Sequence, residues 1–177
     1  MATVTALALL PSAVRAQEGL LAVENLGAWT FECFDAGDAG RQCQLHHRTS
    51  VPDAPNVVVM AAAFSDATGG TLQAEIVLPL GIDLPTPPQL RIDGAVVASL
   101  PVSRCIAEGC LVEGILPREL VDQLQAAGTA AITTSVSNNA QTLTIPFPTD
   151  GFSDAITRLQ EETALRDAAN SGAAAQD

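Results

Sequence analysis

Apolar and polar residues alternate along much of the chain, which is the period of strands with one buried face. Trp29, Phe31 and Cys33 alternate with polar residues, so we expect a strand with these three side chains facing the core. The DAGDAG sequence of residues 35–40 favours a turn, and alternation resumes over residues 43–47. Together these stretches predict a hairpin.

Further strands are predicted between turns that are rich in Pro, Gly and Asn. Residues 57–64 are a continuous apolar run, which predicts a strand buried on both faces or nearly so. The pairs Asp93-Gly94 and Asn138-Asn139 favour hairpin turns. A short hairpin is predicted at residues 102–112, with Glu108-Gly109 at its tip. The remaining predicted strands are residues 72–78, 90–92, 96–97, 129–137 and 141–147.

Two segments follow the helical period. Pro117 suits the first position of a helix, Leu120 and Leu124 lie one turn apart, and Gly128 is a stop signal, so a short helix is predicted here. A terminal helix is predicted from about Gly151, with one apolar stripe formed by Phe152, Ala155, Ile156 and Leu159. The last nine or so residues are rich in Ala, Gly and Ser, and we expect a frayed tail.

Seven or eight short strands and two short helices predict a mainly β fold. The expected architecture is a single antiparallel β-sandwich-like domain with two short helices, one of them C-terminal. A parallel βαβ fold would need crossover helices, and the pattern contains none. We assign residues 17–26 to a lead-in, residues 27–160 to the β domain, and residues 161–177 to the end of the terminal helix and a flexible tail.

The charge balance excludes several classes of protein. The 177 residues carry 20 acidic and 8 basic side chains, a net charge of -12, so there is no cationic surface for a nucleic acid. All the cations are arginines, which excludes Schiff-base chemistry and a phosphate-binding P-loop, because both need Lys. The hydrophobic fraction of 47% is ordinary for a globular domain and argues against a disordered chain.

The first residues favour export. Residues 2–10 are small and apolar, and Val14-Arg15-Ala16 fits the small-x-small rule of signal peptidase, so we predict a signal peptide at residues 1–16 and a mature start at Gln17. The run lacks a preceding cation, which leaves open an upstream start codon or a buried N-terminal segment. It is far shorter than the roughly 18 to 20 apolar residues of a membrane span, so no transmembrane segment is expected in the mature chain. The predicted location is periplasmic or secreted.

The four cysteines form two local pairs. Of the three possible connectivities we favour Cys33 with Cys43 and Cys105 with Cys110, because each pair closes a hairpin-sized loop and disulfides are the expected state of an exported chain. A thiol redox site or a zinc site is the alternative. Neither pair has the C-x-x-C spacing that those sites usually need.

The chain lacks the motifs that carry a known mechanism. It contains no G-x-S-x-G, G-x-G-x-x-G, P-loop or H-E-x-x-H sequence. His46 and His47 are adjacent, and a strand sends adjacent side chains to opposite faces, so the pair is not expected to bind one metal. We therefore predict no catalytic residue, no cofactor and no metal ligand.

Three further residue groups have a structural and a functional interpretation. Asp35 and Asp38 could offer oxygen ligands to Ca²⁺, but the loop lacks the further acids of an EF-hand, which favours a solvated turn. Trp29 is in phase with its buried neighbours and is expected in the core rather than on a recognition surface. Arg104, beside the second cysteine pair, is either a recognition residue or an ion-paired strand residue.

The order and spacing of several stretches resemble the invasion-associated locus B family of exported proteins of Gram-negative bacteria. The resemblance covers about residues 27–160, and the stretches that carry it are W-T-F-E-C at residues 29–33 with Cys43, P-L-G-I-D-L-P at 79–85, L-R-I-D-G at 90–94, R-C-x4-C at 104–110, the helix with Leu120, Leu124 and Gly128, and G-F-S-D-A-I at 151–156. No single motif among them is diagnostic.

The resemblance implies a β-rich periplasmic or envelope-associated protein, linked in some pathogens to entry into host cells. It implies no enzymatic activity and supplies no catalytic residues. The predicted function is therefore that of a non-enzymatic exported protein, whose partner is an unknown protein of the envelope or the host. A Ca²⁺-dependent module or an unconventional envelope enzyme is the alternative.

Overall fold

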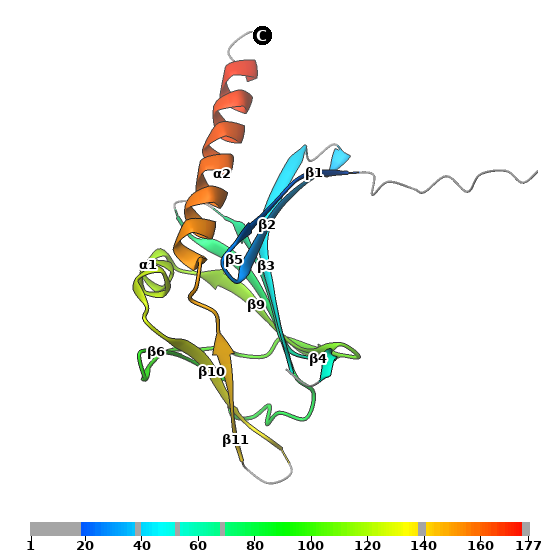
Figure 1. Ribbon diagram of the computed structural model, residues 1–177, viewed down its shortest axis with the longest axis vertical. Coiled ribbons are helices and arrows are strands. Elements are labelled where there is room, and N and C mark those ends of the chain that lie inside the picture. The colour runs from blue at the N-terminus through cyan, green and yellow to red at the C-terminus, as the bar shows by residue number, and fades with distance from the viewer. Residues whose placement is uncertain (1–18, 38–39, 52–53, 68–69, 138–140, 175–177) are drawn as a thin grey trace, which may run out of the picture.

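A computed structural model describes residues 19–37, 40–51, 54–67, 70–137 and 141–174. The predicted signal peptide, Gln17, Asp38 and the Asn138-Asn139 turn lie outside these residues. Strands arranged in two antiparallel sheets make up most of the described chain, and two helices accompany them (Figure 1). The predicted fold class, mainly β with a C-terminal helix, is confirmed.

The larger sheet contains seven strands in the order β1-β2-β3-β4-β5-β9-β8. Their bounds are β1 Leu20–Leu26, β2 Trp29–Asp35, β3 Arg41–Val51, β4 Ala54–Asp66, β5 Leu72–Leu78, β8 Arg104–Ile106 and β9 Gly109–Leu116. The smaller sheet has the order β11-β10-β6-β7. Its strands are β6 Gln89–Ile92, β7 Ala95–Ser99, β10 Ala130–Ser135 and β11 Thr142–Phe147.

Helix α1 spans Arg118–Ala126 and helix α2 spans Phe152–Ala174. Pro117 is the N-cap of α1 rather than its first helical residue, and the buried side chains of α1 include the predicted Leu120 and Leu124. Both helices and the smaller sheet supply side chains to one core, which also contains the inward row of the larger sheet. The core thus lies on one face of the seven-stranded sheet.

An aromatic cluster occupies the centre of this core. Trp29 of β2 has ring centroids at 5.2 to 5.5 Å from those of Phe64, Phe147 and Phe152, which belong to β4, β11 and α2. The indole Nε1 of Trp29 donates a hydrogen bond to the carbonyl oxygen of Pro148 at 3.1 Å. The cluster therefore links both sheets to the start of α2, and the predicted core position of Trp29 agrees with its 1% exposure.

Two glycines allow the start of α2 to meet the β1–β2 turn. Gly27 and Gly151 both have positive φ, at 59° and 72°. A Cβ added to Gly27 would lie 2.7 Å from the carbonyl oxygen of Asp150, and a Cβ added to Gly151 would overlap the carbonyl oxygen of Leu26. The N–H of Ala28 donates to the carbonyl of Asp150 at 3.2 Å. Only a residue without a side chain fits at either position.

The predicted turn at Asp93-Gly94 is present between β6 and β7. Asp93 has φ 47° and Gly94 has φ 83°, as a type I′ turn requires. The Asp93 carboxylate also accepts a hydrogen bond from the N–H of Thr129 at 2.8 Å, which ties this turn to the chain that enters β10.

Within the strand predicted at residues 57–64, one face is buried from residue 60 to residue 64 and the other face is half-buried. Met60, Ala62 and Phe64 of β4 are buried, whereas the intervening Ala61 and Ala63 are half-buried. The inward side chains meet the helices and the smaller sheet, and those layers cover a single face of the larger sheet. Small apolar residues such as Ala61 and Ala63 fit a half-buried face as well as a buried one. A continuous apolar run therefore does not show by itself that both faces of a strand are fully covered.

The first and last segments of the described residues are more regular than the sequence pattern predicted. The lead-in of residues 17–26 contains strand β1, which pairs with β2. The terminal helix is 23 residues long and continues into the stretch that was expected to fray. Its buried residues lie in the first turns, and its later turns extend past the sheets in Figure 1. Good helix formers such as Glu, Ala, Leu and Arg dominate those later turns.

Candidate functional site

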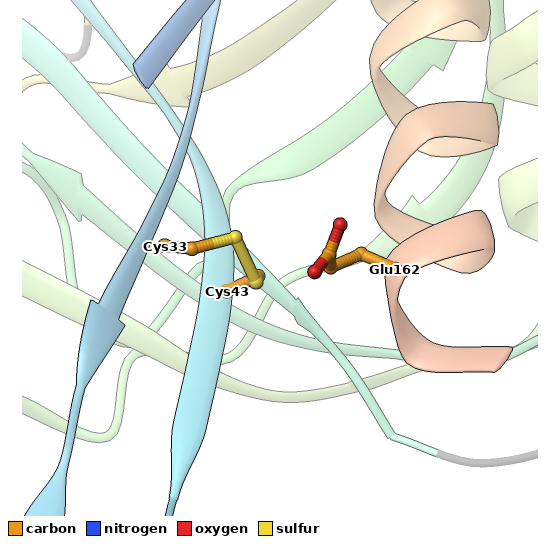
Figure 2. Close-up of side chains that lie close together, drawn as sticks. All are labelled: Cys33, Cys43 and Glu162. Atoms are coloured by element: carbon orange, nitrogen blue, oxygen red, sulfur yellow. A yellow bond between two sulfur atoms is a disulfide. The ribbon is translucent and has the colours of Figure 1, made fainter. Parts of the chain in front are cut away.

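The disulfide between Cys33 and Cys43 joins directly opposed residues of β2 and β3. Their Cα atoms are 4.1 Å apart, and Cys33 has an exposed fraction of 0%. Figure 2 shows the two sulfur atoms facing the carboxylate of Glu162 on α2. The pairing is the one favoured by the sequence spacing.

Glu162 is the centre of an ion-pair network, here termed the Glu162 cluster, formed with Arg41 of β3 and Arg158 of α2. Its carboxylate oxygens lie 2.7 Å from Nε of Arg41 and 3.0 Å from Nη1 of Arg158. The Arg158 guanidinium also lies 3.3 Å from the Glu24 carboxylate and 4.5 Å above the Phe31 ring. The cluster thus fastens α2 to β1, β2 and β3.

Cys33, Cys43 and Glu162 place possible metal-ligand atoms within 4.8 Å of one another, and they are the only such group of three or more found among the described residues. The two sulfurs are bonded to each other, so neither is a thiolate. The carboxylate is already occupied by two guanidinium groups. The arrangement suits helix docking and does not suit the binding of a cation.

The second disulfide joins Cys105 and Cys110, again directly opposed residues, at the edge hairpin of β8 and β9. Beside it, Nη1 of Arg104 lies 2.6 Å from the Glu113 carboxylate, which also accepts a hydrogen bond from the Ser103 hydroxyl. The Ser103 hydrogen bond, more than the Arg104 charge, holds the pKa of Glu113 below its usual range. Arg104 is therefore an ion-paired strand residue.

The two histidines point to opposite faces of β3. His47 lies on the inner face, where Nδ1 is 2.6 Å from the Ala28 carbonyl and Nε2 is 2.9 Å from the Thr49 hydroxyl. A carbonyl can only accept, so Nδ1 carries a proton and donates it to Ala28, and the Thr49 hydroxyl is the hydrogen-bond partner of Nε2. His46 lies on the outer face, 3.4 Å from Glu32. The histidines share no ligand position.

Asp35 takes part in the turn after β2. Its carboxylate accepts the N–H of Gly37 at 2.9 Å, which is the hydrogen bond of an Asx turn. Asp38 lies outside the described residues. Asp35 therefore has a local structural partner, and this observation does not favour a calcium site.

Sequence reasoning missed the Glu162 cluster, although part of its signal is local. Arg158 and Glu162 are four residues apart and therefore share a helix face. Arg41 belongs to a strand far away in the sequence, and only the packing of α2 brings it to Glu162. A helical i, i+4 search would have found one of the two ion pairs.

The sheet edges are unequally protected against another chain. Strand β8 has three residues, β11 carries Pro146, and β7 contains a register shift and is followed by Pro101. Strand β1 also has a register shift, between Leu20 and Ala22, and is regularly paired from Ala22 to Leu26. It exposes Leu20, Leu21 and Val23, with exposed fractions of 45%, 51% and 53%. Among the four edge strands, β1 exposes the most large aliphatic side chains.

Neither helix in the described part of the chain is long and apolar enough to cross a membrane.

Comparisons with known proteins agree with the predicted family. The chain matches the family model described as "Invasion associated locus B (IalB) protein" over residues 29–160. Two invasion protein B homologs of Brucella abortus, from strain 2308 and from biovar 1 strain 9-941, are each 24% identical over 140 residues, which is 79% of this chain and 80% of each relative. The crystal structure of invasion associated protein B from Bartonella henselae superimposes with a TM-score of 0.73 at 22% identity, over 81% of this chain and 98% of that one.

Proposed function

This chain belongs to the invasion associated locus B family, and we propose that it is an exported, non-enzymatic protein of the bacterial envelope that acts by binding another protein. The observation that carries the binding role is the exposed apolar edge of β1. Such an edge offers unpaired backbone groups together with aliphatic side chains, which suits the addition of an extended strand from a partner.

The two closed disulfides support export. Both cysteine pairs are joined, and structural disulfides persist in oxidising compartments such as the periplasm and the extracellular medium. In this proposal the signal peptide is removed after Ala16, so that β1 begins shortly after the mature N-terminus. Strand β1 would then be close to a free chain end, where a partner strand has access to it.

Intact mass tests export and oxidation together. The endogenous protein is isolated from separated periplasm, outer membrane and medium, and its mass is measured with and without reduction and alkylation. We expect a start at Gln17 with all four cysteines unavailable to alkylation until reduction. An uncleaved chain with four free thiols would contradict export.

The β1 surface is tested by a matched pair of edge variants. Val23→Lys places a charge on the β1 edge, and Val96→Lys places the same charge on β7, where Val96 has a similar exposed fraction of 47%. We expect Val23→Lys to abolish cross-linking between a photoreactive residue at Leu21 and its partner in the envelope fraction, and Val96→Lys to leave it unchanged. Equal cross-linking in both variants would exclude the β1 edge.

The names of the relatives refer to invasion, and a direct role in host-cell invasion requires display outside the outer membrane. Protease treatment of intact cells measures that display. Cleavage would support an adhesin-like role, whereas full protection would leave a role inside the envelope and contradict surface display.

A further inference from the structure

An apolar cleft of about 460 Å³ is lined by β5 and β9, which are separated from β1 by at least three strands of the larger sheet. Its walls come from the end of β7, the inner faces of β5 and β9, and helix α1. The aliphatic side chains that line it include Ile76, Val97, Leu100 and Leu120. Small-molecule sites in proteins have volumes of roughly 300 to 1,000 Å³ and mostly apolar walls. The cleft has the size and lining of such a site.

Two small residues, here termed the floor of the cleft, lie side by side in its lining. Ala74 of β5 and Gly114 of β9 are directly opposed in the sheet and both line the cleft. A Cβ added to Gly114 would have no atom within 4 Å, and Gly114 has no positive φ. Neither backbone conformation nor close packing therefore requires glycine here. Gly114 is exposed, so the space beside it is open to a ligand that enters from solvent.

The polar groups at the cleft indicate which head group an occupant would carry. Glu119 and Gln123 of α1 lie at its rim, and no arginine lines it among the described residues. Glu113 also borders the cleft, but its carboxylate already accepts a hydrogen bond from Ser103 and forms an ion pair with Arg104. Glu119 is thus the available charge, and it would repel an anionic head group and attract a cationic one.

The neighbouring edge of β7 argues against a protein strand as the occupant. The register of β7 shifts against β6 between Leu90 and Arg91, and Pro101 follows the strand without a backbone N–H. Both features interrupt the row of hydrogen-bonding groups that an added strand would need.

We propose that this cleft binds a small amphiphile, with an unbranched aliphatic chain above Ala74 and Gly114 and an uncharged or cationic head group at Glu119 and Gln123. Burial of each methylene between apolar walls should strengthen binding by about fourfold. The assignment does not depend on the partner-binding role of β1, because the cleft is formed by different elements of the fold.

Three probes of equal chain length test the assignment: decylammonium, decanol and decanoate. Their binding to the full chain, with both disulfides closed, is measured by titration calorimetry below the micellar concentration of decylammonium and decanoate and below the solubility limit of decanol. We expect decylammonium and decanol to bind and decanoate to bind at least tenfold more weakly. Glu119→Gln should reduce the advantage of decylammonium over decanol by about two- to fivefold. Failure of all three probes to bind, or a preference for decanoate, would overturn the proposal.

Two blocking variants locate the bound probe. Gly114→Leu fills the floor, and Gln123→Trp covers the rim from an exposed helix position that is outside the core. Gln160→Trp makes the same exchange at an exposed position of α2 away from the cleft. We expect the first two variants to lose binding and Gln160→Trp to retain it. Thermal melting shows whether Gly114→Leu is folded. If it is not, probe binding to Gln123→Trp alone tests whether the probe occupies the cleft. Binding that persists in both blocking variants would overturn the assignment.

Discussion

The two disulfides join the same kind of residue pair in different surroundings. Each connects directly opposed residues of antiparallel neighbours, with Cα–Cα distances of 4.1 and 4.0 Å. Cys33–Cys43 lies beside the aromatic core and the Glu162 cluster, where α2 meets the sheet. Cys105–Cys110 lies in the edge hairpin of β8 and β9, and Cys105 is exposed.

This difference indicates that the contacts around a disulfide determine how much it contributes to the free energy of unfolding. The paired cysteines are 10 and 5 residues apart in sequence. In the chain-entropy account, doubling the loop length adds only about 0.6 kcal/mol. Any larger difference in stabilisation must come from the native contacts around each disulfide.

Removing each disulfide gives the largest expected effect. Cys33→Ala with Cys43→Ala should lower the free energy of unfolding by about 4 kcal/mol, because the loss of chain constraint, about 2.7 kcal/mol, is joined by lost packing in the core. Cys105→Ala with Cys110→Ala should cost about 2 kcal/mol. Urea unfolding of the two double variants measures the difference. A gap of 0.6 kcal/mol or less would mean that loop length alone separates the two sites.

The backbone contact at the start of α2 comes next. Gly151→Ala should cost about 3 kcal/mol, because a side chain at positive φ is strained and its Cβ would overlap the Leu26 carbonyl. Gly37→Ala is the matched control, since Gly37 has φ 62° and nothing within 4 Å of an added Cβ. The control should cost about 1 kcal/mol. Equal losses in urea unfolding would show that φ, and not the contact between α2 and the β1–β2 turn, sets the cost.

The ion pairs beside the two disulfides form a second matched comparison. Glu162→Gln should destabilise by about 1 to 2 kcal/mol, since the Glu162 side chain is only 13% exposed and its charge pairs with Arg41 and with Arg158, of which Arg158 keeps Glu24 as a second partner. Glu113→Gln should have a smaller effect, because its partner Arg104 is 57% exposed and water can replace the carboxylate. Thermal melts at low and high salt distinguish the two, and the opposite ranking would contradict the docking role of Glu162.

The smallest expected effects are two pH dependences of opposite sign. The pKa of Glu113 is lowered, so its stabilising contribution is present above its unfolded-state pKa and is lost as pH falls through its folded-state pKa. The pKa of Asp66 is raised, mainly by burial, so its contribution is present below its unfolded-state pKa and is lost as pH rises through its folded-state pKa.

Carboxyl NMR titrations of both residues check these directions. Ser103→Ala should move the pKa of Glu113 back towards its usual range, because the hydroxyl is the main cause of the lowering. The same variant should leave the pKa of Asp66 unchanged, so Asp66 serves as the internal control. If the pKa of Glu113 did not change in this variant, Arg104 rather than Ser103 would be the main cause of its lowering.

Local patterns made much of the fold predictable. Trp29, Phe31 and Cys33 alternate as the buried row of β2, Asp93-Gly94 forms the expected turn, and the stripe from Phe152 to Leu159 is the buried face of α2. Each signal spans only a few residues and reports a periodicity that the backbone imposes. The same locality explains the cysteine pairing, because both pairs lie across short hairpins.

The fold class, the cysteine pairs, the acidic character and the resemblance to the family could all be inferred from residues close together in sequence or from composition. Tertiary structure decided that β1 is an exposed edge, that Arg41 meets Glu162, and that Gly114 forms the floor of a cleft. The physical reason is that periodicity and turn chemistry act between near neighbours in sequence. Edges, ion pairs between distant elements and clefts arise only when sheets and helices pack against one another.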